Sequence, residues 1–178
     1  MIDSEIWKEK LEQDVRSLRK RLNQRRWTER SVVLFERELM LTFFSIRALI
    51  EAGKLTDRTS QKEYGFITYP NKGKIVDDIT KYDFYEIFDL DSGIEKKLTL
   101  KLLTHQFIHA YVIFTEFSEE GKAVGVLLCS DWKKNNNLIQ LPISLAINII
   151  EDVIADKVRS VRLHRNEKTS ELRNVKIY

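Results

Sequence analysis

The spacing of apolar residues predicts two long helices in the first 53 residues. From Ser4 to Asn23 the apolar positions recur every three or four residues and form a narrow stripe on an otherwise charged segment, made of Trp7, Leu11, Val15, Leu18 and Leu22. From Ser31 onward the apolar positions cover a much broader face, which predicts the central buried helix of the molecule. Thr28 is the expected N-cap of this helix, with Ser31 as the alternative, and Gly53 is its expected stop.

The segment after the helical hairpin carries turn and capping signals. Residues 63–76 consist of two extended runs with turn residues at 70–73, which predicts a β-hairpin. Ser92 and Glu95 have the spacing of a capping box, and they predict a helix over residues 98–110.

The period of the pattern changes from near 3.6 before Gly53 to near 2 after Tyr111. Three extended runs within residues 111–143 predict the strands of an antiparallel meander. Residues 144–157 have the apolar spacing of an amphipathic helix, with Ser144 as a candidate N-cap.

These elements together predict an α+β fold, in which an N-terminal long helical hairpin packs with a small antiparallel sheet and two further helices. We expect a single domain over residues 1–178. Its parts are a helical hairpin (1–53), an α/β body with a short helix near its middle (54–157), and a basic C-terminal β-hairpin (158–178) in which apolar and polar residues alternate.

Composition and charge narrow the class of protein. The chain has no apolar segment of membrane-spanning length and no signal-peptide pattern at its start, and its single cysteine, Cys129, rules out an internal disulfide, so we expect a cytoplasmic protein. Lys and Arg outnumber Asp and Glu by nine to six in residues 1–30 and by seven to two in residues 157–178. The remaining residues carry fourteen Lys and Arg against nineteen Asp and Glu, so the middle of the chain is acidic. Such asymmetry of charge indicates either a polyanionic partner or self-association of unlike surfaces.

The basic ends predict a surface that contacts nucleic acid. An aromatic residue among arginines is able to stack on a base, and the candidate residues are Arg19, Arg21, Arg25, Arg26, Trp27, Arg30, Arg162 and Arg165. The alternative is a solvated helix face paired with nearby acids, with Trp27 packed on the second helix. Assembly with another protein explains the same charges equally well.

His105 and His109 are four residues apart on one predicted helix face, a spacing that two ligands of a divalent ion use. Further ligands would have to come from elsewhere, for example Glu36, Asp131 or His164. We expect instead a structural role with no metal and no cofactor, in which His109 is mostly buried among apolar neighbours and His105 less so.

The alternative role for these histidines is in a nuclease-like enzyme. The end of their helix is loosely similar to HEPN-type ribonucleases, whose helix carries an arginine a few residues before a histidine. Leu102, Leu103 and Thr104 occupy those positions here, so the arginine of that motif is absent.

Two stretches, NQRRWTERSVVLFERELMLTFFSIRALIEAGKLTD and LLTHQFIHAYVIF, resemble a family of uncharacterised bacterial proteins found on genomes and mobile elements. The resemblance covers residues 10–155 and implies no catalytic residues, because no activity is known for that family. The basic segment 158–178 lies outside it.

The sequence therefore favours a non-enzymatic binding or assembly protein, with possible nucleic-acid contact through its basic ends and no membrane contact. We also expect a homo-oligomer, with a dimer favoured. Three surfaces are candidates for its interface. One is the narrow stripe of the first helix, which needs one partner helix in its own chain or in another copy. The second is the part of the broad apolar face of the helix from Ser31 that the rest of the chain leaves uncovered, and the third is the exposed strands of residues 158–178.

Overall fold

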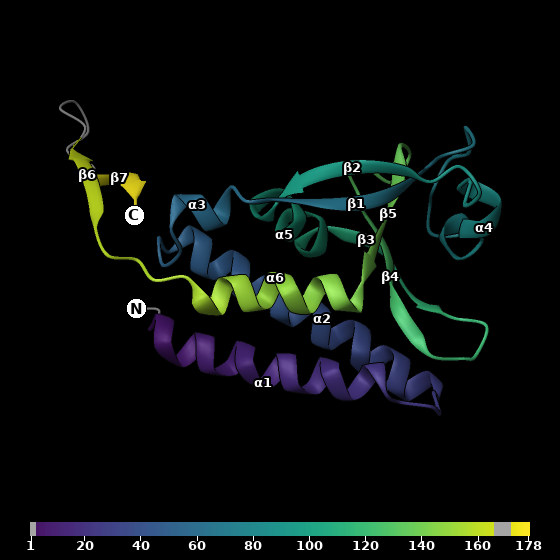
Figure 1. The fold of residues 1–178 in the computed structure, drawn as a ribbon. Coiled ribbons are helices and arrows are strands. Elements are labelled where there is room, and N and C mark those ends of the chain that lie inside the picture. Colours follow the sequence, from purple (N-terminus) through teal and green to yellow (C-terminus); the bar gives the residue numbers. More distant parts are fainter. Residues whose placement is uncertain (1–2, 166–171) are drawn as a thin grey trace.

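A computed structural model describes residues 3–165 and 172–178 of the chain (Figure 1). Four of its helices (α1, α2, α5 and α6) lie over one face of a five-stranded antiparallel sheet with the strand order β2-β1-β5-β4-β3. The α+β prediction is confirmed. The elements are α1 (Ser4–Leu22), α2 (Glu29–Glu51), α3 (Asp57–Ser60), β1 (Glu63–Pro70), the 3-10 turn η1 (Thr80–Tyr82), α4 (Phe84–Ile87), β2 (Ile94–Thr99), α5 (Leu100–Ile108), β3 (Ala110–Phe117), β4 (Ala123–Ser130), β5 (Asn137–Pro142), α6 (Ile143–Ala155), β6 (Val161–Arg165) and β7 (Leu172–Ile177).

Local capping signals define the helical hairpin as predicted. Thr28 caps α2 in a reciprocal box: its hydroxyl accepts from the Ser31 amide at 3.3 Å, and its own amide donates to the Ser31 hydroxyl at 2.8 Å. Gly53 ends the hairpin with a φ of 65°, a left-handed conformation that glycine adopts without steric cost. None of the helices in the described part of the chain has the length and apolarity needed to cross a membrane.

The stripe of α1 is buried within its own chain. Leu11, Val15 and Leu18 belong to the main core, where α6 is the larger partner of α1 and α2 the smaller one. Arg19 of α1 also pairs with Glu151 of α6 at 2.5 Å. Leu11, Val15 and Leu18 are therefore not available to a second copy, and the sequence pattern did not predict α6 as the main partner of α1.

The pairing of β1 corrects two predictions. Residues 63–76 do not form a hairpin: β1 pairs with β2 on one side and β5 on the other, and Asn71 forms an isolated bridge with Phe88. Ser92 and Glu95 do not cap a helix, because Glu95 lies within β2 opposite Ile67. Thr99 is the actual N-cap of α5, which begins at Leu100 and ends at Ile108.

The meander of β3, β4 and β5 is confirmed, and both faces of β4 are buried. The face away from the helices packs against the segment between β1 and β2, with a second core of Val76, Ile87, Phe88, Val112, Leu127, Cys129 and Leu138. Burial raises the pKa of the Cys129 thiol to about 12, so this cysteine is a protonated core residue. The short helix expected in residues 77–90 is the single turn α4, preceded by η1.

α6 follows β5 without a connecting loop. Its first residue is Ile143 and no side chain caps its start, so Ser144 lies inside the helix and is not its N-cap. Its end is held by Asp156, whose carboxylate accepts from the Thr56 amide at 2.8 Å, the Thr56 hydroxyl at 2.6 Å and the Thr59 hydroxyl at 2.7 Å. These bonds tie α6 to α3.

The predicted C-terminal hairpin is also confirmed, as a separate two-stranded sheet of β6 and β7 beyond the end of α6 (Figure 1). It is attached to the body through the Ile177 amide, which donates to the Asp57 carboxylate at 3.0 Å. Residues 166–171, which include the NEKTS stretch and Lys168, lie outside the described residues.

We expect Leu18→Ala to lower the free energy of unfolding by about 2–5 kcal/mol, because Leu18 is fully buried between helices and its truncation leaves a cavity. Ile6→Ala, on the exposed surface of the same helix, should change it by less than about 0.5 kcal/mol. Urea unfolding followed by circular dichroism measures both. Equal effects of the two substitutions would contradict this packing of α1.

Candidate functional site

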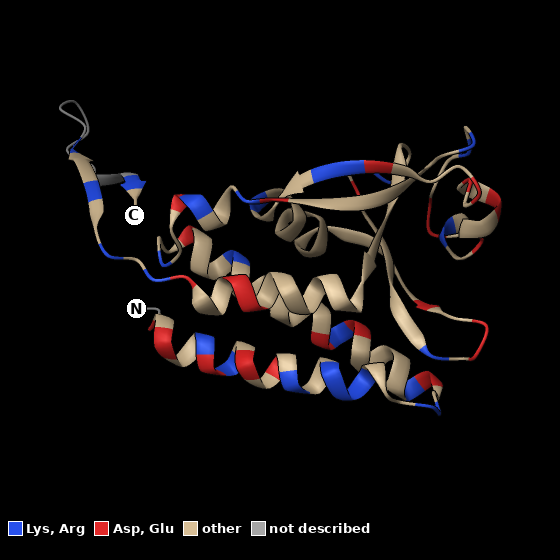
Figure 2. Cartoon of the chain, in the orientation of Figure 1, with Lys and Arg blue, Asp and Glu red and all other residues tan. Residues whose placement is uncertain are grey.

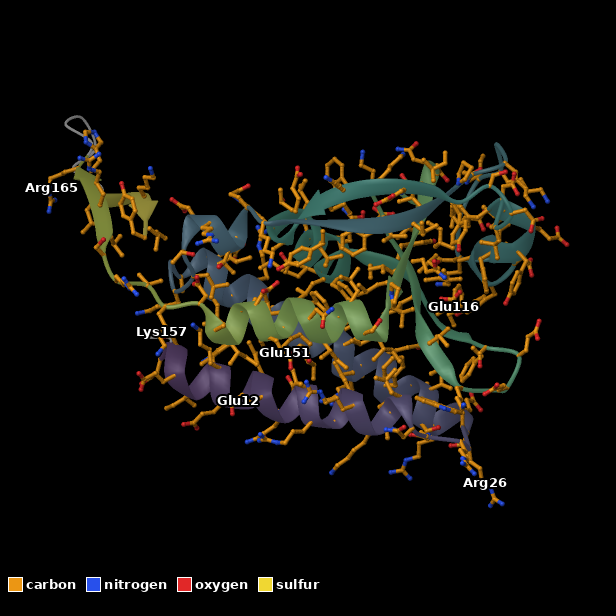
Figure 3. The ribbon with its side chains drawn as sticks, viewed as in Figure 1. Glu12, Arg26, Glu116, Glu151, Lys157 and Arg165 are labelled. Carbon is orange, nitrogen blue, oxygen red and sulfur yellow. The ribbon has the colours of Figure 1, made fainter. Side chains whose placement is uncertain are left out.

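The turn between α1 and α2 carries a cluster of exposed basic side chains. Figure 2 shows Lys and Arg gathered over the second half of α1 and this turn. Arg25, Arg26 and Arg30 are exposed, and no acidic side chain in the described part of the chain forms an ion pair with them or with Lys20. We call these four residues the basic turn; in Figure 3 Arg26 points away from the body of the protein.

Two of the predicted arginines serve the fold instead. Arg19 pairs with Glu151 across the α1–α6 contact, at the position labelled Glu151 in Figure 3. The Nε atom of Arg21 lies 3.6 Å from Oε2 of Glu38, and its Nη1 atom donates to Oε1 of Gln24 at 2.9 Å. The Arg21 side chain is largely buried. Both arginines therefore have an acidic partner within their own chain.

Trp27 is not a stacking platform. Its ring contacts Phe35 and Phe117 edge to face, each at 5.6 Å between ring centroids, and its indole nitrogen donates to the Gln24 carbonyl at 3.1 Å. The Arg21 guanidinium lies 5.8 Å from the ring centroid. These contacts agree with the alternative interpretation, in which Trp27 packs on the second helix, and the side chain also joins α2 to the end of β3.

The second basic patch lies at the other end of the molecule. Arg162 and Arg165 are exposed on β6, and Figure 3 places Arg165 and Arg26 at opposite ends. The basic N-terminal and C-terminal segments therefore do not combine into one surface.

The exposure of the two histidines is the reverse of the prediction. His105 is half-buried, whereas His109 is exposed and is the C-cap of α5. The helix ends one residue before His109, which turns this side chain out of the apolar neighbourhood that the sequence indicated. The imidazole centroids are 4.4 Å apart, so the two rings do share a face of the molecule.

Arg47 is the cationic side chain that acts on the His105 end of this pair. Burial lowers the pKa of His105, and the nearby His109 and Arg47 lower it further. Arg47 extends from α2, donates to Glu51 at 2.6 Å and approaches the Lys101 carbonyl of α5 at 3.4 Å.

The candidate additional ligands do not join the histidines. Glu36 accepts from the Thr115 amide at 2.9 Å, and Asp131 pairs with Lys134 at 2.7 Å. His164 is on the distant strand β6. Over residues 3–165 and 172–178, no three His, Cys, Asp or Glu residues are grouped so that they could hold a metal ion.

A polar row on the sheet face away from the helices escaped the sequence analysis. The Tyr69 hydroxyl donates to the Gln140 side chain at 3.2 Å, and Gln140 donates to Glu116 at 2.6 Å. Burial raises the pKa of Tyr69, and the negative charge of Glu116 raises it further. Because each donor in the row has an acceptor, we interpret it as a structural link between β1, β5 and β3.

An apolar surface on α2 stays uncovered within its own chain, as the sequence analysis expected of a helix whose apolar face is wider than its neighbours can cover. Its exposed side chains are Val33, Leu34, Met40, Leu41 and Phe44. The signal was the width of the pattern, which is greater than one core contact requires.

We expect His109→Gln to raise the pKa of His105, because His109 lowers this pKa more than Arg47 does. Arg47→Gln should raise the same pKa by a smaller amount. NMR titration of the His105 ring measures both. A depressed pKa means that the unfolded chain binds the proton more tightly. The contribution of His105 to stability is therefore present above pH 6.5 and is lost as the pH falls from there through the pKa in the folded state. No change of this pKa in His109→Gln would contradict the assignment.

Comparison with known proteins gives no relative from which roles could be transferred. No protein-family model, no curated protein and no solved structure matches this chain. The resemblance of residues 10–155 to uncharacterised bacterial proteins thus stays a prediction.

Proposed function

We propose that this protein is a non-enzymatic binding protein that contacts the phosphate backbone of nucleic acid through the basic turn. The observation that carries the proposal is the exposure of Lys20, Arg25, Arg26 and Arg30 without an acidic partner among the described residues. Unpaired guanidinium and ammonium groups retain their full capacity to neutralise phosphates.

The shape of this region supports contact with an extended polyanion. The basic turn is the connection of a helical hairpin and lies at the periphery of the molecule (Figure 2). The charges are not confined in a cavity. Such an arrangement suits a long ligand that passes over the surface.

The same geometry argues for binding without base recognition. Trp27 is the aromatic residue within the basic turn, and its packing against Phe35 and Phe117 leaves it unsuited to stack on a base. Phosphate contacts position a protein on nucleic acid but carry no sequence information. We therefore expect weak sequence preference and a strong dependence on salt.

Replacement of Lys20, Arg25 and Arg26 by glutamine should weaken binding to a duplex DNA of random sequence. If each residue contacts one phosphate, the slope of log K against log salt should fall by about 2 to 3. Fluorescence anisotropy at several salt concentrations measures this slope. Arg30 is left unchanged, because it also borders the exposed side of α2.

A matched control has the same loss of charge elsewhere. Lys96, Lys97 and Lys101 are exposed on β2 and α5, and their triple replacement by glutamine should leave the slope nearly unchanged. If the two triple variants lost the same amount of slope, net charge alone would explain the effect, and a specific role of the basic turn would be contradicted. Absence of binding by the unaltered protein at low salt would also contradict the proposal.

A nuclease that uses His105 and His109 is the second candidate, and the position of Arg47 favours it. A guanidinium beside two imidazoles is a combination that could hold a phosphate near groups able to transfer a proton. If this candidate is correct, RNA cleavage by the purified protein should be lost in both His105→Ala and His109→Ala. Cleavage that persists in both variants, or that is absent from the unaltered protein, would eliminate it.

A further inference from the structure

α2 carries a second apolar face, opposite the one that it buries. The buried face is formed by Phe35, Leu39, Phe43, Ile46 and Leu49. The exposed fractions on the other side are 56% for Val33, 43% for Leu34, 36% for Met40, 47% for Leu41 and 53% for Phe44. At about 100° per residue, these five side chains lie within an arc of about 120° on the side opposite the buried face, and we call them the outer face of α2.

A groove runs beside this face. It has a volume of about 640 Å³ and lies between α1 and α2, with Leu34, Leu41 and Phe44 along one wall. Trp7 contributes an aromatic surface from α1. Within it, the nearly buried Asp14 accepts from Lys10 at 2.5 Å and from the Thr42 hydroxyl at 3.0 Å, so its charge is compensated. The groove is thus able to receive apolar side chains next to a balanced polar floor.

We propose that a second copy of this chain binds to the outer face of α2 and the adjoining groove, with the two α2 helices antiparallel about a twofold axis. This assembly goes beyond the proposed nucleic-acid contact. The two surfaces share only Arg30, so loss of nucleic-acid binding in the triple variant of Lys20, Arg25 and Arg26 and loss of the dimer are separate outcomes. A twofold interface uses the same surface on both copies, so one exposed apolar face is sufficient to form it.

The charges that border the face select the antiparallel arrangement. Arg30 and Arg37 are exposed toward the start of α2, and Glu51 is exposed at its end, where one of its carboxylate oxygens accepts from Arg47 of the same helix and the other has no partner among the described residues. With the axis between Met40 and Leu41, the sequence positions bring Arg30 opposite the partner's Glu51 and Arg37 opposite the partner's Phe44. The first is an ion pair, and the second is a cation–π contact. A parallel arrangement would instead place each arginine opposite its own copy.

The available area is in the range that a stable dimer needs. A helix of 23 residues is about 35 Å long. Together with the neighbouring ridge of α1, it offers a face about 20 Å wide, or roughly 700 Å² per copy. Specific interfaces bury about 600–1,000 Å² per partner.

Sedimentation equilibrium of the full chain at tens of micromolar tests the proposal. We expect a mass near twice 21.1 kDa for the unaltered protein. Leu41→Glu should weaken the dimer about 100-fold or more and give a mass near 21.1 kDa, because each dimer contains the substitution twice. Ile6→Glu, an equally drastic change at an exposed apolar position of α1 outside the groove, should leave the dimer intact.

Charge reversal separates an interface defect from a folding defect. Arg30→Glu and Glu51→Arg should each weaken the dimer, and the chain that carries both should recover it, since the pair is re-formed with its charges exchanged. Unchanged circular dichroism of Leu41→Glu shows that this variant is folded. A mass of 21.1 kDa for the unaltered protein would overturn the proposal, and so would a folded Leu41→Glu variant that stays dimeric.

Discussion

The burial of α6 is the constraint on which the arrangement of the other helices depends. Six of its side chains are buried, since α6 lies between the sheet and α1: Ile143, Ala146, Ile147, Ile149, Ile150 and Val153. Its start is fixed because it continues directly from β5, and its end is fixed by the bonds from Asp156 to Thr56 and Thr59. A helix that is apolar on most sides needs such enclosure, and α1 provides the side that the sheet leaves open.

The position of α6 explains why α2 has an exposed apolar face. α1 buries its narrow stripe mainly on α6, so it covers only one edge of α2. α2 is held from the other side by α5, where Phe43 and Phe107 stack with their ring centroids 4.1 Å apart. The side of α2 between α1 and α5 is not covered by another element, and the outer face of α2 lies on that side.

Sequence patterns predicted the elements whose signals are local, and failed where a distant segment decides the outcome. Thr28 and Gly53 define the ends of the helical hairpin through their own capping and backbone preferences. In contrast, β1 pairs with β2, and the turn residues at 70–73 gave no indication of this partner. Strand pairing depends on the whole sheet and not on the nearest turn. The predicted burial of His109 was wrong for the same reason, because it depends on where α5 ends. The packing of Trp27 on α2 was foreseen as an alternative, but its contact with Phe117 of β3 was not. Of the candidate site residues, Arg25, Arg26, Arg30, Arg162 and Arg165 have the exposure that the sequence led us to expect.

The two proposed surfaces have complementary consequences for binding. The basic turn ends at Arg30, in the first turn of α2, whereas the proposed axis passes near the middle of that helix. An antiparallel pair would therefore place its two basic turns at opposite ends of a helix pair about 35 Å long. Two weak phosphate-binding sites in one particle bind a long polyanion more tightly than either site alone, because the second contact forms at a high effective concentration. Lys20, Arg25 and Arg26 lie outside the outer face of α2 and stay free in the proposed dimer, whereas Arg30 would pair with the partner. Self-association would therefore strengthen nucleic-acid binding through the three residues that both copies leave exposed.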